Sequence, residues 1–114
     1  MAIVNITTQN DSDFIRSFAY QTVAGAPIDL TGDKMRMGIR RRAQDVTEEL
    51  LLTTENGGLE ITDAVNGVFQ VWITNAQLLA LQLGNYEHSL IRIVGALQLR
   101  IWSGALTVNA GPSR

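Results

Sequence analysis

His88 is the single histidine of the chain and the side chain best suited to acid–base chemistry near neutral pH. It lies between Glu87 and Ser89, and these residue types together could serve general acid–base or nucleophilic catalysis. The three residues belong to a stretch with strand periodicity, in which adjacent side chains point to opposite faces. Glu87 and Ser89 therefore cannot converge on His88 locally. A partly buried histidine with an ordinary hydrogen bond is the favoured interpretation, and an enzyme that brings carboxylates to His88 from distant strands is the alternative.

Other chemistry finds little support in the residue types and their spacing. The sequence has one histidine and no cysteine, which argues against a transition-metal site. Its acidic residues lack the spacing of a calcium-binding loop. Gly57-Gly58 is not followed by the lysine and helix start of a phosphate-binding loop, and Gly32 and Gly38 match no dinucleotide fingerprint. We therefore expect a protein that is not an enzyme and needs no cofactor or metal.

Positive charge is concentrated in one stretch, because five of the nine lysines and arginines fall within residues 34–42. Arg36 and Arg40 share one face of an expected strand, whereas Arg41 and Arg42 enter the next loop. A solvated surface, balanced by acidic residues just downstream, is the leading interpretation. A contact with an acidic surface of a partner protein comes second. Nucleic acid is disfavoured, since no aromatic residue interleaves with the arginines. The balancing acidic residues are Asp45, Glu48 and Glu49.

Both tryptophans break the alternation of the strands in which they lie. Trp72 shares the polar phase of its strand with Gln70, and Trp102 shares the polar phase of its strand with Arg100. The core-facing positions of these two strands are then Phe69, Val71 and Ile73, and Leu97, Leu99 and Ile101. Exposed tryptophan is enriched at interface hot spots, so we predict that Trp72 or Trp102 contacts another chain. Cover by the short helix, a terminus or a bulge near Gly104 is the alternative. The candidate interface residues are Trp72, Trp102, Arg36 and Arg40.

The elements that carry these residues are short runs of alternating apolar and polar side chains, each closed by a turn signal. Such runs, spaced by roughly 8–12 residues, are typical of a sandwich or a barrel. The expected strands cover residues 2–8, 14–22, 34–41, 48–53, 59–62, 68–74, 85–93, 97–103 and 105–108, with Gly104 as a bulge glycine.

A short helix is expected near residues 75–83. Thr74 or Asn75 can cap it, and Gly84 ends it. Its apolar face would hold the residues at i, i+3, i+4 and i+7, which are Ala76, Leu79, Ala80 and Leu83. We expect one or two helical turns that cross an end of the sandwich.

Length and charge bound the remaining possibilities. A chain of 114 residues predicts a single domain, residues 1–114. The net charge of −2 is too small for a committed polyanion binder. Residues 1–5 lack the basic start and apolar stretch of a signal peptide, and no run approaches the ~20 apolar residues of a membrane span. We expect a soluble protein made in the cytoplasm, with no membrane partner.

Three stretches resemble a known family. Residues 26–32, which read APIDLTG, are similar to its "G-x-P-I-D-L-T-G" signature. Residues 84–90 resemble its "G-x-Y-x-y-x-L" strand, and residues 102–108 resemble its closing "G-x-l-x-V" strand. The family is the immunoglobulin-like domain at the N-terminus of phage baseplate upper proteins, together with related short proteins of phages and prophages. Family members continue into coiled coils and receptor-binding parts, whereas this sequence ends at Arg114.

The resemblance implies an all-β, immunoglobulin-like antiparallel sandwich of about seven to nine strands. The runner-up fold for the strand pattern is a small antiparallel barrel. Tyr86 is placed like the tyrosine corner of such folds. The resemblance also implies a structural protein of the virion, a docking module of the tail, baseplate or head surface. Its partners would be other virion proteins and a second copy of itself. A cellular β-sandwich binding protein unrelated to virions is the alternative.

Overall fold

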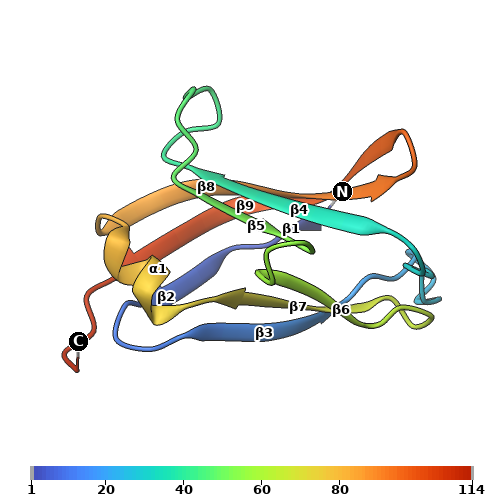
Figure 1. Ribbon diagram of the computed structural model, residues 1–114, viewed down its shortest axis with the longest axis horizontal. Helices are drawn as coiled ribbons and strands as arrows, with labels where there is room; N and C mark the ends of the chain where they lie inside the picture. The colour runs from blue at the N-terminus through green and yellow to red at the C-terminus, as the bar shows by residue number, and fades with distance from the viewer. Residues whose placement is uncertain (1, 114) are drawn as a thin grey trace.

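Two β-sheets packed face to face make up the computed structural model, which describes residues 2–113 (Figure 1). That part of the chain forms one helix, α1 (Asn75–Ala80), and nine strands. The strands are β1 (Ala2–Ile3), β2 (Ile6–Gln9), β3 (Phe14–Ala19), β4 (Lys34–Arg40), β5 (Leu50–Thr53), β6 (Leu59–Asp63), β7 (Val68–Ile73), β8 (Gly84–Val94) and β9 (Leu97–Asn109).

The strand order is that of an immunoglobulin-like sandwich. One sheet has the order β1-β9-β8-β4-β5, with β2 also paired to β9, and the other has the order β3-β7-β6. β1 and β2 run parallel to β9, and every other pair is antiparallel. The small sheet thus corresponds to immunoglobulin strands B-E-D and the large sheet to G-F-C-C′. Two separate sheets confirm the predicted sandwich.

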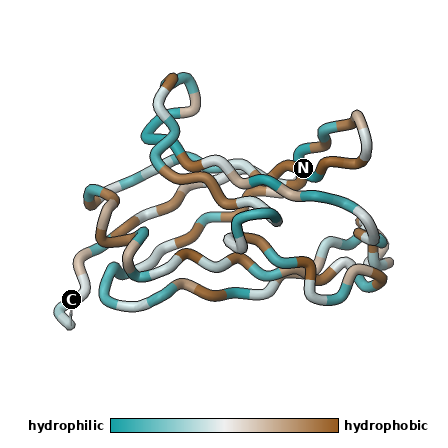
Figure 2. Tube along the Cα trace, viewed as in Figure 1, coloured by the Kyte–Doolittle hydropathy of each residue, from teal (hydrophilic) through white to brown (hydrophobic). Residues whose placement is uncertain are grey.

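The core lies between the sheets and is filled by alternate residues of facing strands. Figure 2 shows this alternation of hydrophobic and hydrophilic positions along the strands. In β7 the predicted core phase is confirmed, because Phe69, Val71 and Ile73 are at most 1% exposed. In β4 the side chains of Met35, Met37 and Ile39 are equally buried, while Arg36 and Arg40 point outward.

Helix α1 begins where the sequence predicts, but it buries a different face. The Thr74 hydroxyl accepts a hydrogen bond from the amide of Gln77, and the Gln77 side chain accepts one from the amide of Thr74, which is a capping box. Leu78 and Leu81 are buried, whereas Leu79, which was expected on the apolar face, is 48% exposed. The expected face assumed helix through residue 83, but the chain is already extended at Leu81.

The predicted tyrosine corner is confirmed at the start of β8. The Tyr86 hydroxyl donates to the carbonyl oxygen of Gln82 at 2.6 Å, and the ring is buried. The Arg41 guanidinium lies 4.6 Å from the centre of this ring and donates to the carbonyl oxygen of Asn85. One arginine of the basic stretch therefore serves the fold, since it fastens the loop after β4 to the corner.

Residues 26–32, which carry the best of the resembling motifs, close the other end of the sandwich. Leu30 is fully buried and its amide donates to the carbonyl oxygen of Ala64 at 2.8 Å. The Asp29 carboxylate accepts from the hydroxyl of Thr31 at 2.5 Å and from its amide at 2.8 Å. These two bonds lower the pKa of Asp29. Gly32 has a φ of +78°, which only glycine adopts without strain.

A β-bulge in β9 reverses the expected position of Trp102. Leu90 lies opposite Trp102, but the next residue, Ile91, lies opposite Arg100, so Ile101 is the extra residue. The bulge moves Trp102 to the core side of the sheet, where it is only 4% exposed. The prediction that Trp102 lies on the polar face is therefore wrong, and its side chain has no surface to offer another chain.

Two further expectations for β9 are corrected. Leu97 and Leu99 are 62% and 42% exposed rather than buried, because the β8–β9 hairpin extends past the end of the small sheet (Figure 1). Gly104 is not a bulge, since it pairs with His88 and the register of β8 and β9 shifts only between Leu90 and Ile91. A glycine is needed there because a Cβ atom would collide with the carbonyl oxygen of Val4.

Truncation of the aromatic core should unfold the domain more easily. We expect Phe69→Ala and Trp102→Ala each to lower the free energy of unfolding by about 3–5 kcal/mol, because each leaves a large cavity between the sheets. Urea unfolding followed by fluorescence and circular dichroism measures this. Leu97→Ala, at an exposed site, is the control and should change stability by less than about 0.5 kcal/mol. A Trp102→Ala variant as stable as this control would contradict the assigned position of Trp102.

Candidate interaction surfaces

A shallow groove of about 560 Å³ crosses the outer face of the six-stranded sheet. Its floor is a row of small residues, Gly38, Ser89 and Ser103, which lie side by side on β4, β8 and β9. Outward-pointing side chains on either side of this row form the walls of the groove. We call this surface the outer groove.

The two walls of the outer groove differ in character. One is the row Arg36, Ile91 and Arg100, and the other is formed by Arg40 and Glu87. The β4–β5 loop and the β8–β9 hairpin both project on the side of the sheet away from the small sheet (Figure 1). The groove therefore lies on a face bounded by two protruding segments and carries charges of both signs.

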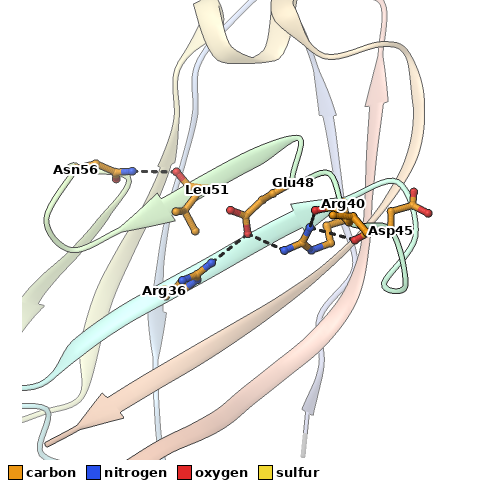
Figure 3. A network of polar contacts seen from close by, with 7 residues as sticks. Arg36, Arg40, Asp45, Glu48, Leu51 and Asn56 are labelled. Atoms are coloured by element: carbon orange, nitrogen blue, oxygen red, sulfur yellow. Dashed lines mark hydrogen bonds and ion pairs between the residues drawn. The ribbon is translucent and has the colours of Figure 1, made fainter. Parts of the chain in front are cut away.

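Glu48 binds both arginines of the predicted interface set. Its Oε2 atom lies 3.4 Å from Nη2 of Arg36 and 3.6 Å from Nη2 of Arg40 (Figure 3). The carboxylate reaches across Gly38, where a Cβ atom would approach this oxygen to 2.8 Å. Arg40 also donates to the carbonyl oxygens of Asp45 and Val46. The predicted shared face of Arg36 and Arg40 is confirmed, and both charges have partners within the chain.

This arrangement favours a surface that can exchange its partners. Ion pairs between partly exposed side chains stabilise a fold by only about 0–1 kcal/mol, so an incoming carboxylate could replace Glu48 at little cost. Arg100, on the same face, has no ion pair among residues 2–113. Chemically, the outer groove suits a polar, mixed-charge protein surface.

Trp72 lies on the opposite side of the molecule, on the outer face of the small sheet. It is 39% exposed, as the sequence predicts, and sits directly opposite Ile15 of β3, which is 56% exposed. The indole Nε1 donates to the carboxylate of Asp13 at 3.1 Å, and the same carboxylate accepts from the amide of Asn75. We call Ile15 and Trp72 the tryptophan patch. Ile15 is not among the predicted interface residues, because its pairing with Trp72 depends on which strands share a sheet.

The four predicted interface residues therefore do not form one site. Arg36 and Arg40 belong to the outer groove, Trp72 belongs to the tryptophan patch, and Trp102 is buried between the two sheets. The structure divides the candidate set into two surfaces on opposite faces of the sandwich.

His88 has no arrangement for acid–base catalysis among residues 2–113. It is 4% exposed, and its ring stands nearly perpendicular to that of Trp102. Burial lowers the pKa of His88, and backbone groups of Ala105 and Val4 offset part of this effect. The predicted burial is confirmed. Within residues 2–113, no cluster of three or more acidic, histidine or cysteine side chains could hold a metal ion.

The comparisons with known proteins agree with the fold. No protein-family model and no curated protein matches the sequence. The N-terminal domain of phage TP901-1 ORF48 is similar in structure, with a TM-score of 0.51 at 18% identity, over 95% of this chain and 85% of that one. The Ig1 domain of mouse SynCAM 2 has a TM-score of 0.43 at 13% identity, over 95% of this chain and 93% of that one. The first likeness shows that this chain shares its fold with a phage domain, as the three motifs predict.

No helix within residues 2–113 is long and apolar enough to cross a membrane.

The buried His88 should make the fold less stable in mild acid. Its pKa in the folded protein lies below the ordinary value of 6.5, so as pH falls below about 6.5 the unfolded chain takes up a proton that the folded chain does not. The free energy of unfolding should therefore fall between about pH 7 and pH 5. Urea unfolding at several pH values measures the slope. In His88→Gln this part of the slope should disappear, and an identical slope in the variant would exclude His88 as its source.

Proposed function

We propose that this chain is a structural component of a phage or prophage particle and has no enzymatic activity. It acts as a docking or adaptor module at the tail, baseplate or head surface and joins proteins through its sheet faces and loops. Its partners are other virion proteins, and it is made in the cytoplasm before it enters the particle. The structural likeness to the N-terminal domain of phage TP901-1 ORF48, over nearly the whole chain, carries this proposal.

The placement of the candidate surfaces supports an adaptor role. The outer groove and the tryptophan patch lie on opposite faces of the sandwich, and neither contributes to the core. Two partners can therefore bind at once without competing for the same residues. Of the motifs that resemble the phage family, residues 26–32 lie at one end of the sandwich, whereas residues 84–90 and 102–108 run through β8 and β9 and contribute Glu87, Ser89 and Ser103 to the outer groove. Within these motifs, Leu30 and Tyr86 hold the two ends of the fold together.

Analysis of purified particles tests the proposal. Phage particles induced from the source strain and purified on a density gradient should contain this chain in a fixed ratio to a tail or capsid protein. Its absence from intact particles, when it is present in the lysate, would contradict the virion role. The alternative, a cellular β-sandwich binding protein, predicts metabolic genes beside its gene instead of tail or capsid genes.

Truncation of Trp72 should weaken assembly more than it weakens the fold. We expect Trp72→Ala to cost about 2 kcal/mol of binding to the virion partner, roughly a 30-fold rise in Kd, because a partly exposed indole ring is a typical anchor. Stability should fall by only about 1 kcal/mol, the value of the lost hydrogen bond to Asp13. Incorporation into particles and urea unfolding measure the two effects. Val65→Ala, at another exposed apolar site, is the control.

The arginines of the outer groove should speed association with the partner through their charge. We expect the double variant Arg36→Ala and Arg40→Ala to slow association with the partner and to reduce its dependence on salt, because groups at the rim of an interface act mainly on the association rate. Surface plasmon resonance at several salt concentrations measures both quantities. An unchanged rate and salt dependence would remove the outer groove from the proposed interface.

A further inference from the structure

The edges of the two sheets differ in how they are protected. An unprotected edge strand presents free backbone N–H and C=O groups and pairs readily with another strand, so proteins usually block such edges. In the large sheet, Asn56 blocks the outer edge of β5. Its side chain donates to the carbonyl oxygen of Leu51 at 2.9 Å and accepts from the amide of Thr53 at 2.9 Å, and Figure 3 shows the first contact.

At two further sheet edges the row of backbone N–H and C=O groups is interrupted. Along β6 the register with β7 shifts between Ile61 and Asp63, which bends this edge. The opposite edge of the large sheet consists of β1 and β2, which are separated by Val4 and Asn5. The Asn5 side chain accepts from the amide of Ala105 at this break. Neither edge offers a long, regular row of backbone groups.

The outer edge of β3 has none of these features. Its six residues pair with β7 without a register shift, from Phe14 opposite Ile73 to Ala19 opposite Val68. The strand contains no proline, glycine or lysine. Its single charge is on Arg16, and this guanidinium lies 5.2 Å from the centre of the Phe18 ring of the same strand.

Two hydrogen bonds establish which backbone groups face this open edge. The amide of Tyr20 donates to Gly67 on the β7 side, so every second residue before it, Phe18, Arg16 and Phe14, also bonds to β7. The amide of Trp72 donates to Gly58, away from β3, which gives the same phase independently. The N–H and C=O groups that point outward from the sheet are therefore those of Ile15, Ser17 and Ala19.

We propose that β3 pairs antiparallel with β3 of a second copy of this chain, about a two-fold axis that passes beside Ser17. The two small sheets then join into one continuous sheet. In this register Ile15 lies opposite Ala19 of the second copy, and the outward groups of all three residues find partners, in about six hydrogen bonds.

The side chains of β3 favour this occupant and this register. Arg16 lies opposite Phe18 of the second copy, so each guanidinium has an aromatic ring on both strands. The neighbouring register, centred on Arg16, would instead place two guanidinium groups opposite each other, which is unfavourable. A two-fold axis perpendicular to the sheet also keeps both tryptophan patches on one face, on either side of the seam.

The expected association is weak, because a six-residue seam is small compared with interfaces that stay closed at low concentration. Such a contact forms where copies are held close together, as on a particle. The proposal thus names a partner for the proposed docking module. The self-pairing is tested with the isolated protein, so a negative result would not bear on the virion role. Conversely, absence of the chain from particles would not bear on the self-pairing, which this test alone decides.

Variants of Ser17 test the pairing without touching the contacts of β3 with β7. Ser17→Pro removes an outward N–H that does not bond to β7, and prolines are tolerated at such edge positions. Ser17→Lys, a second route that does not depend on the proline, sets two positive charges against each other at the axis. Thr62→Lys, on the opposite edge of the same sheet, adds the same charge and is the matched control.

Sedimentation velocity from about 10 µM to about 1 mM measures the association, with thermal unfolding of every variant as the check on folding. The wild type and Thr62→Lys should show a concentration-dependent dimer, and both Ser17 variants should be folded monomers. Amide hydrogen exchange should show protection of Ile15, Ser17 and Ala19 that grows with concentration.

Three results would overturn the proposal. One is a wild type that remains monomeric at about 1 mM. Another is a dimer that persists in either folded Ser17 variant. The third is a dimer in which the three outward amides of β3 exchange as fast as in the monomer, because that dimer would use another surface.

Discussion

The burial of Trp102 between the two sheets is the interaction on which the rest of the structure depends. Its ring lies 4.7 Å from that of Phe18 and 5.6 Å from that of Phe69, both of the small sheet, measured between ring centres. Antibody domains join their sheets by a disulfide against which a tryptophan packs. This chain has no cysteine, and an aromatic cluster contributed by three strands takes that place.

The cluster exists only because β9 contains a bulge. Without the extra residue at Ile101, the indole ring of Trp102 would point to the outer face, as strict alternation predicts. The same shift leaves Arg100 on the outer face, where it forms part of a groove wall. A single irregularity in strand pairing thus places Trp102 at the centre of the core while Arg100, two residues before it, stays on the exposed face.

Strict alternation made most of the fold predictable, and its failures have physical causes that lie outside any one strand. The core phase of β7 could be read from the sequence because that strand is central and regular. The bulge in β9 is a property of its pairing with β8, so no pattern within β9 reveals it. Leu97 is exposed because the opposite sheet ends before it, and the length of that sheet follows from the turns that bound its own strands.

For the candidate surfaces, the sequence predicts which side chains point outward but not which of them lie on the same face of the sandwich. The shared face of Arg36 and Arg40 follows from a period of two, and so does the outward position of Trp72. Their separation to opposite sides of the sandwich depends on which strands share a sheet, which a single sequence does not state. The contact of Asn56 with the edge of β5 was equally hidden, because it depends on how a turn folds back onto its own strand.

The folded chain offers three separate directions for contact with other chains. Leu30 and Tyr86 close the two ends of the sandwich. The surfaces available for contact with another chain are the outer groove, the tryptophan patch and the edge of β3. The two faces offer side chains, whereas the edge offers backbone groups. Pairing along the edge would therefore extend the sheet sideways and leave both faces available, which is the geometry that a module linking several proteins requires.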